Sequence, residues 1–358
     1  MVKVTIHPRW EINFPTGQSL DAATLLALLL GIADTGSIAQ AAKVAGLSYR
    51  YAWGLLREAE GLFGEALLDT GRGRGTRLTP LAQKMVWADR RITARLAPTL
   101  ASLATELESE LGKMSSERFG QLRIDASHGF AVAALTEHLA AAQLPVELRY
   151  RNSTDAVAAL SRHECDLAGF HVPIGEHQAA AVAWYARWLD PEQHCLLQLG
   201  ERQQGLFVAP GNPLRLRGLT DLLRPQVRFV NRQAGSGTRM LLELLLKGSG
   251  LSAHDINGFN NTEFTHSAVA AYIASGMADV GVGVRTAAER FGLDFVPLLR
   301  ERYFFALPIA ALDEPTMRHV VAVVQSGAYR RAVDALPGYS AFETGTILTL
   351  EQAFALAA

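Results

Sequence analysis

The sequence of 358 residues predicts a mixed α/β chain with a small helical N-terminal domain, one long connecting helix and a larger α/β domain of two lobes. Three observations predict it. Apolar residues follow a helical period over residues 19–63, leucines recur every three or four positions over 96–111, and strand-like and helix-like segments alternate from residue 121 onward. The predicted boundaries are 1–79, 80–117 and 118–358. With 49% hydrophobic and 19% charged residues, the composition excludes a disordered chain.

The first eighty residues begin with a loosely alternating stretch, 2–14, which predicts one or two short strands. Ser19 is then expected to cap a helix that runs to residue 34. Ser37 begins the capping-box pattern S-x-x-Q and predicts a short second helix that ends at Gly46. Ser48 is expected to cap a third helix over 48–62. A Gly-containing turn between the second and third helices is typical of a helix-turn-helix.

The third helix has two different faces. Its predicted core stripe consists of Ala52, Leu55, Leu56, Ala59 and Phe63. The capping serine and the outward residues are the DNA-binding candidates, namely Ser48, Tyr49, Arg50, Trp53 and Arg57. Trp53 could equally close the core. Arginines and large aromatics turned outward are unusual for a buried packing helix and suit a helix that enters the major groove of DNA.

Residues 67–79 predict a β-hairpin with a basic, glycine-rich tip, GRGRGTR. Its three arginines, Arg72, Arg74 and Arg77, are further DNA-binding candidates, because arginines neutralise phosphates and glycines let the backbone approach them. The segment 43–95 holds 10 basic and 5 acidic residues, although the whole chain has a net charge of −1. The alternative for the hairpin is a solvated basic loop.

A long helix is predicted from Pro80, with Thr79 as its cap, to about residue 113, with a kink at Pro98. It carries an apolar seam of Leu96, Leu100, Leu103, Leu107, Leu111 and Met114. Pairing with a second copy would bury this seam and predicts a homodimer or tetramer. The alternative is packing against the helix's own chain.

The remainder alternates between strands and helices, which predicts parallel sheets with crossover helices. The expected strands are 121–126, 146–151, 166–170, 194–199, 205–209, 227–230, 279–284 and 294–299. The expected helices are 129–142, 154–162, 236–247 and 267–275.

Polar loops follow several of these strands and precede helices, where open α/β sheets bind ligands and helix N-termini favour anions. The effector-binding candidates are Ser127, His128, Ser153, Asn231, Arg232, Ser236, Gly237, Thr238, Thr265, His266, Ser267 and Tyr303, with His171 as a weaker one. For any one of these serines, the alternative is that it only caps a helix and binds no ligand. Histidine spacing matches no zinc pattern, and Walker A and GxSxG motifs are missing. No catalytic residue, metal or cofactor is therefore expected.

Two segments resemble known families. GSIAQAAKVAGLSYRYAWGLLREAE (36–60), with the basic hairpin, resembles the winged helix-turn-helix of molybdate-responsive ModE-type regulators, which is close to the LysR type; this resemblance covers about 20–112. VNRQAGSGTR, FTHSAVAAYIASGMADVGVGV and GLDFVPL resemble the type 2 periplasmic-binding-protein-like domain allied to molybdate and tungstate binders, over about 118–345.

The resemblance implies a one-component transcriptional regulator that binds double-stranded operator DNA and senses a small anion between two lobes. Molybdate or tungstate is favoured, with formate or another small carboxylate as the alternative. A second hypothesis, a solute-binding protein for an oxyanion transporter, is opposed by the winged domain and by an N-terminus unlike a signal peptide. An enzyme is the third and weakest. The longest apolar run, 22–33, is too short to cross a bilayer, so a soluble, cytoplasmic protein without membrane contact is expected.

Overall fold

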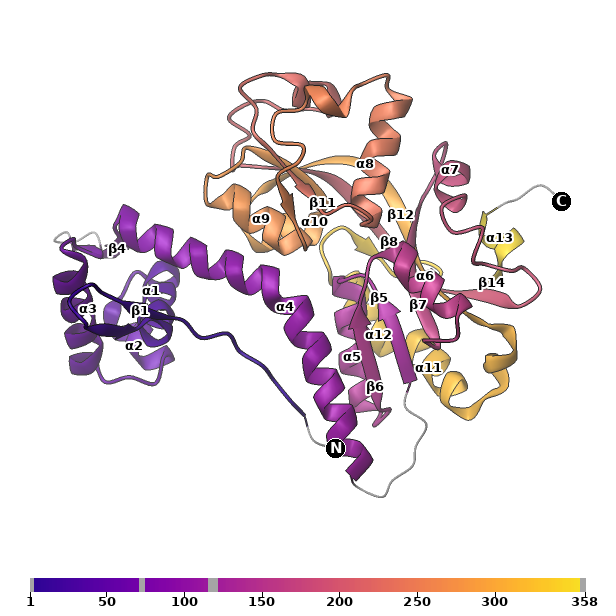
Figure 1. The fold of residues 1–358 in the computed structure, drawn as a ribbon, viewed down its shortest axis with the longest axis horizontal. Helices are drawn as coiled ribbons and strands as arrows, with labels where there is room; N and C mark the ends of the chain where they lie inside the picture. Colours follow the sequence, from indigo (N-terminus) through magenta and orange to yellow (C-terminus); the bar gives the residue numbers. More distant parts are fainter. Residues whose placement is uncertain (1–2, 71–74, 115–121, 355–358) are drawn as a thin grey trace. The chain divides into compact units, whose positions relative to one another are not determined.

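The computed structural model describes residues 3–70, 75–114 and 122–354. These residues form two compact units, His7–Ala94 and Met1–Ile6 together with Arg95–Ala358. Figure 1 shows a small helical unit, the long helix α4 (Pro80–Met114) and an α/β unit with helices on both faces of its strands. The predicted fold class is confirmed.

The small unit consists of three helices and two short hairpins. Its elements are β1 (Glu11–Asn13), β2 (Ser19–Asp21), α1 (Ala22–Thr35), α2 (Ile38–Val44), α3 (Tyr49–Phe63), β3 (Leu68–Thr70) and β4 (Thr76–Leu78). Leucines of α1 and α3, such as Leu28 and Leu56, and alanines of α2 form one buried core. The prediction that Ser19 caps α1 is wrong. Ser19 pairs with Asn13 in the β1–β2 hairpin, and the carboxylate of Asp21 caps the helix by accepting a hydrogen bond from Ala23 N at 3.1 Å.

Helix α4 continues through Pro98, which lies inside it. Beyond residue 95 one face of α4 packs on the α/β unit. There Ser102 Oγ accepts a hydrogen bond from Tyr150 N (3.0 Å), and Thr105 Oγ1 donates one to Leu148 O (2.9 Å). The seam leucines Leu96, Leu103, Leu107 and Leu111 are exposed.

The first lobe of the α/β unit, lobe 1, is a sheet between two helical layers. Its elements are β5 (Leu122–Ala126), α5 (Phe130–Ala141), β6 (Val146–Tyr150), α6 (Ser153–Ser161), β7 (Leu167–Pro173), α7 (Gln178–Val182), α11 (Pro315–Gln325), α12 (Gly327–Asp334), β13 (Tyr339–Ser340), β14 (Ile347–Thr349) and α13 (Leu350–Phe354). Strands β5, β6 and β7 are parallel. Helices α5, α11 and α12 share one core with the sheet, and α6 and α13 share the other.

Lobe 2 contains β9 (Phe229–Arg232), α8 (Gly237–Gly248), β10 (Thr262–Glu263), α9 (His266–Ala274), β11 (Val280–Val284) and α10 (Arg285–Arg290). Strands β9, β10 and β11 are parallel, so their carboxyl ends meet at one edge. Helices α8 and α9 begin at that edge. Their caps are Ser236, which accepts from Arg239 N, and Thr265, which accepts from Ala268 N.

Two long strands, β8 (His194–Val208) and β12 (Asp294–Pro308), run through both lobes as an antiparallel pair. The first half of β8 and the second half of β12 belong to lobe 1; the other halves belong to lobe 2. The sequence predicts separate strands at 194–199 and 205–209 and a strand that stops at 299, and both predictions are wrong. The polar stretch 200–204 remains in the sheet because β12 supplies its partners along the whole length.

Among the described residues, no helix has the length and apolar character needed to cross a lipid bilayer.

Candidate functional site

The helix-turn-helix of the small unit is built by local signals. Ser37 Oγ accepts from Gln40 N at the start of α2, and Ser48 Oγ accepts from Tyr51 N at the start of α3. Between the helices, Gly46 has φ +70°, a conformation that favours glycine. The predicted inward stripe of α3 is confirmed for its four small and leucine members, Ala52, Leu55, Leu56 and Ala59.

The opposite face of α3 is exposed. Tyr49, Arg50 and Arg57 lie on it, and Trp53 is 36% exposed. The Arg57 guanidinium lies 5.1 Å from the Trp53 ring and 3.7 Å from a carboxylate oxygen of Glu60. Stacking on Trp53 holds Arg57 along the helix surface with its remaining N–H groups turned to solvent.

The basic hairpin is formed by β3 and β4, which pair in antiparallel fashion with Asp69 opposite Arg77. Arg77 is exposed. A hydrogen bond from Thr76 N to Gly36 O (2.9 Å) ties the hairpin to the turn before α2. Arg72 and Arg74 lie outside the described residues.

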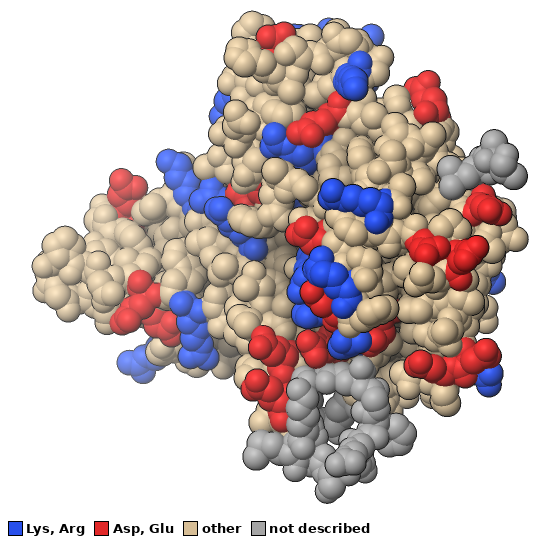
Figure 2. Space-filling view, turned by 45° about the vertical axis from the view of Figure 1, so that its right-hand side comes forward, with Lys and Arg blue, Asp and Glu red and all other residues tan. Residues whose placement is uncertain are grey.

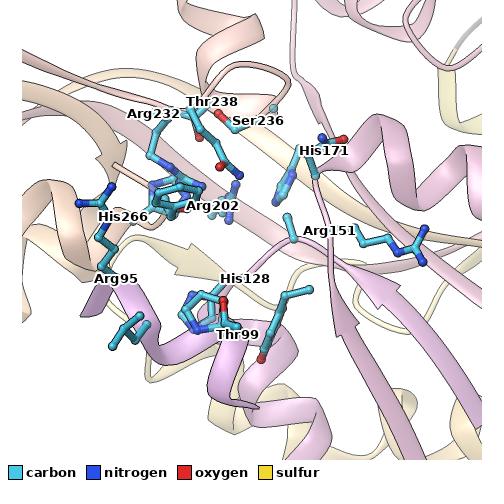
Figure 3. Close-up of a pocket in the computed structure, with 18 residues that line it drawn as sticks. Arg95, Thr99, His128, Arg151, His171, Arg202, Arg232, Ser236, Thr238 and His266 are labelled. Carbon is cyan, nitrogen blue, oxygen red and sulfur yellow. The ribbon is translucent and has the colours of Figure 1, made fainter. Parts of the chain in front are cut away.

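The α/β unit contains a cavity of about 280 Å³. It lies where β5 and β6 of lobe 1 end and where α8 and α9 of lobe 2 begin (Figure 3). Of the residues predicted for an effector site, seven line it: Ser127, His128, Arg232, Ser236, Gly237, Thr238 and His266. His171 also lines it. Residues from three separated loops and from strand β7 therefore meet in one place.

Five predicted residues do not line the cavity. Ser153 Oγ is buried 3.4 Å from His171 Nδ1, and Thr265 caps α9. The Asn231 side chain donates to Phe259 O. Ser267 lies in the first turn of α9, and the buried Tyr303 ring packs edge-on against His171 at 4.4 Å.

The cavity also has lining residues that the sequence reasoning missed. Helix α4 contributes Arg95, Leu96, Pro98 and Thr99, and other elements contribute Tyr150, Arg151, Asn152, Arg202, Gln233 and Phe264. Arg202 was missed because the predicted strands stop at residue 199 and resume at 205, whereas the continuous strand β8 buries it. For Arg95 and Thr99 no local signal distinguishes the cavity from solvent.

Two buried arginines at the cavity differ in how their charge is balanced. Arg202 donates from Nε to Glu301 Oε1, and Gln204 Nε2 donates to the same oxygen (3.0 Å) and to Thr238 Oγ1 (3.1 Å). Arg232 is 6% exposed, donates to Phe264 O (2.8 Å), and has no carboxylate within ion-pair distance among the described residues. Burial, together with the nearby charge of Arg202, lowers the pKa of Arg232 to about 9. Its guanidinium is therefore charged at neutral pH and unbalanced.

The three histidines at the cavity are neutral at pH 7. Burial, with a smaller effect of Arg232, lowers the pKa of His128 to about 4. Burial also places the pKa of His171 and His266 well below the usual range, with Arg202 and Arg232 adding to the effect. Neutral imidazoles donate from one nitrogen and accept at the other, so they can bind an oxyanion without adding charge.

The charge of Arg151 is balanced by the carboxylate of Asp125. Its Nε lies 3.0 Å from Asp125 Oδ2, and its guanidinium is directed away from the cluster of Arg232, His266 and Arg202 (Figure 3). On the face in Figure 2, basic and acidic side chains are interspersed. Arg95, Arg151 and Arg202 thus each have a carboxylate partner, and Arg232 is the arginine of the cavity that has none among the described residues. No group of three or more His, Cys, Asp or Glu residues suited to a metal occurs in the described part of the chain.

Comparisons with known proteins match the helix-turn-helix and the α/β unit to two different families. Residues 136–325 match the family described as PBP superfamily domain, and residues 23–83 match the bacterial regulatory helix-turn-helix protein, lysR family. The chain is 31% identical to the uncharacterized protein YvgK of Bacillus subtilis over 60% of this chain and 69% of that protein.

Two further proteins also match. The molybdenum transport protein ModE of Herbaspirillum seropedicae is 51% identical over 18% of this chain and 26% of its own. The HTH-type transcriptional regulator CbbR of Cereibacter sphaeroides is 26% identical over 76% of this chain and 83% of its own.

Proposed function

Because the chain belongs to the PBP superfamily and is a LysR-type DNA-binding transcriptional regulator rather than an enzyme, with an effector-binding domain, we propose that its effector is a small oxyanion held in the cavity beside Arg232. Molybdate or tungstate is the favoured effector, and formate or another small carboxylate is the alternative. We propose that residues 1–79 bind DNA, that residues 80–117 link the two parts and mediate dimerisation, and that residues 118–358 bind the effector. Since it acts on DNA, we place it in the cytoplasm.

The observation that carries this proposal is the unbalanced charge of Arg232. A buried cation without a carboxylate beside it is costly, and an anion in the cavity would offset that cost. The volume of about 280 Å³ lies below the roughly 300–1,000 Å³ of pockets for drug-sized ligands, which favours a small anion. Hydroxyls at the start of α8 and N–H groups at the starts of α8 and α9 supply further donors.

A thermal-shift comparison of the full chain tests the effector. Molybdate, tungstate, sulfate, phosphate, formate and acetate are added separately at equal ionic strength. An anion at one hundred times its dissociation constant stabilises the folded state by about 2.7 kcal/mol, which raises the melting temperature. Stabilisation by ammonium or tetramethylammonium in place of any anion would contradict the proposal.

For the operator we propose that Ser48, Tyr49, Arg50, Trp53 and Arg57 of α3 enter the major groove and that Arg72, Arg74 and Arg77 of the hairpin contact phosphates. A homodimer or tetramer, paired through the α4 seam, would then read a palindrome. The exposed basic and aromatic face of α3 supports this. The winged domain disfavours the alternative, a solute-binding protein of a transporter.

Two arginine variants separate the two kinds of DNA contact. Arg77→Ala is expected to weaken binding to all DNA sequences and to reduce the salt slope by about one. Arg50→Ala is expected to cost about 1–3 kcal/mol on the operator and to relax base preference at one position. Both are measured by fluorescence anisotropy on operator and scrambled duplexes at several salt concentrations. Arg187→Ala, an exposed arginine of the α/β unit that lies against Trp188, is the control and is expected to change neither value.

A further inference from the structure

Helix α4 forms part of the cavity wall through Arg95, Leu96, Pro98 and Thr99. In Figure 3, Arg95 lies on the side of Arg232 and His266, and Thr99 lies beside His128. Within the next two turns, Ser102 and Thr105 hydrogen-bond to the backbone of β6. The helix that leads to the DNA-binding unit is therefore also a wall of the proposed effector site.

Arg95 connects α4 to lobe 2. Its Nε lies 3.8 Å from Glu263 Oε2, and its guanidinium lies 5.1 Å from the Phe264 ring. Glu263 is almost fully buried, whereas the Arg95 side chain is 51% exposed. Charge-assisted hydrogen bonds measure about 2.7–2.9 Å, so this ion pair is loose and solvent-screened on the arginine side. Because α4 also holds β6 of lobe 1, it bridges the two lobes at the cavity.

Building on the proposed effector site, we propose that Arg95 is an exchangeable second cation of that site: a bound oxyanion replaces Glu263 as its partner. The anion would lie between Arg232 and Arg95, which favours ligands whose oxygens can accept from two guanidinium groups. It also brings negative charge close to Glu263, so the ion pair between Arg95 and Glu263 weakens as the new one forms. Occupancy would thereby alter the contact that joins α4 to lobe 2.

Because Arg95 and Glu263 carry opposite charges, neutralising one is expected to change oxyanion affinity in the opposite direction from neutralising the other. Neutralising Arg95 removes a cation from the ligand, so Arg95→Gln is expected to weaken oxyanion affinity about tenfold. Neutralising Glu263 removes a competitor and a repelling charge, so Glu263→Gln is expected to strengthen affinity about threefold or more. In the Arg95→Gln background the Glu263→Gln effect should shrink to the part that comes from direct repulsion between Glu263 and the anion, because no competition for Arg95 remains. Arg95→Lys should recover part of the affinity.

Calorimetric titration of the full chain with molybdate, sulfate and formate measures these values. Arg318→Gln is the matched control, because Arg318 is a surface arginine paired with Asp313 at 2.9 Å and does not line the cavity. Unchanged affinity in both Arg95→Gln and Glu263→Gln, with binding still dependent on Arg232, would overturn this inference alone. Equal weakening by both substitutions would show a structural role and overturn it too. Absence of binding by all three anions to the wild-type chain would remove the proposed effector and this inference together.

Discussion

Without added anion, Arg232→Met is expected to raise the free energy of unfolding by about 1–4 kcal/mol and, in the same protein, to abolish oxyanion binding. The methionine fills much of the space of the arginine stem and removes a buried charge that no carboxylate of the described residues balances. The hydrogen bond to Phe264 O is lost, but the desolvation penalty of the guanidinium is lost with it. This result would mean that Arg232 destabilises the folded protein without a ligand and that its role is to bind the oxyanion.

The same substitution at Arg202 should have the opposite effect on stability. Arg202→Met leaves Glu301, which is 1% exposed, as a buried carboxylate without its cation, and is expected to cost about 3–5 kcal/mol. Urea unfolding of wild type, Arg232→Met and Arg202→Met in an anion-poor buffer measures both effects. If Arg232→Met unfolds at lower urea than wild type, the charge of Arg232 is balanced in the empty protein and the argument for an anion loses its basis.

Leu103→Asp combined with Leu107→Asp is expected to convert the assembled protein to a monomer and to lower operator affinity by about 10²–10⁴-fold. Both leucines are more than 40% exposed on α4, so the substitutions leave the folded monomer intact but place charges in the proposed seam. Operator affinity falls because a dimer binds two half-sites at once. Its second contact forms at the high effective concentration that the link between the protomers sets, and a monomer lacks this contact.

Light scattering gives the oligomeric state, and anisotropy on the operator gives the affinity. Ile309→Asp is the matched control: Ile309 is 40% exposed on the α/β unit, outside the seam, and should affect neither measurement. An unchanged mass in the doubly substituted chain would place the interface elsewhere. A monomer that still binds the operator with full affinity would refute the coupling between assembly and DNA recognition.

The sequence predicted best what is decided locally. The capping serines Ser37 and Ser48 and the inward stripe of α3 were predictable because each depends on neighbours within one turn of helix. The strand at Ser19–Asp21 was missed because its partner, Glu11–Asn13, lies across a turn and outweighs the helical pattern. The unbroken β8 was missed for the same reason, since its polar middle is held by β12, about one hundred residues later.

In the candidate site, too, the residues identified by local sequence pattern were predicted and those that depend on tertiary packing were not. Ser236, Thr238 and His266 were predictable because they lie in loops at helix starts, a place that local pattern identifies. Which capping residues face the ligand and which face the core depends on rotamers and packing: Ser236 lines the cavity, and Thr265 is fully buried behind it. Arg95 and Arg202 lie in regular elements, and only the tertiary fold brings them to the cavity.

The shared strands β8 and β12 also set an order for biosynthesis. Lobe 2 is nearly continuous in sequence, between Gln204 and Val296, so a ribosome delivers its strands one after another. In lobe 1 the second half of β12 lies between β7 and β8, yet it is made last of these three. Until residue 308 has left the exit tunnel, β5, β6 and β7 are separated from β8 and the edge of β7 has no neighbour. Lobe 1 therefore waits for lobe 2, and the cavity between them is completed late in translation.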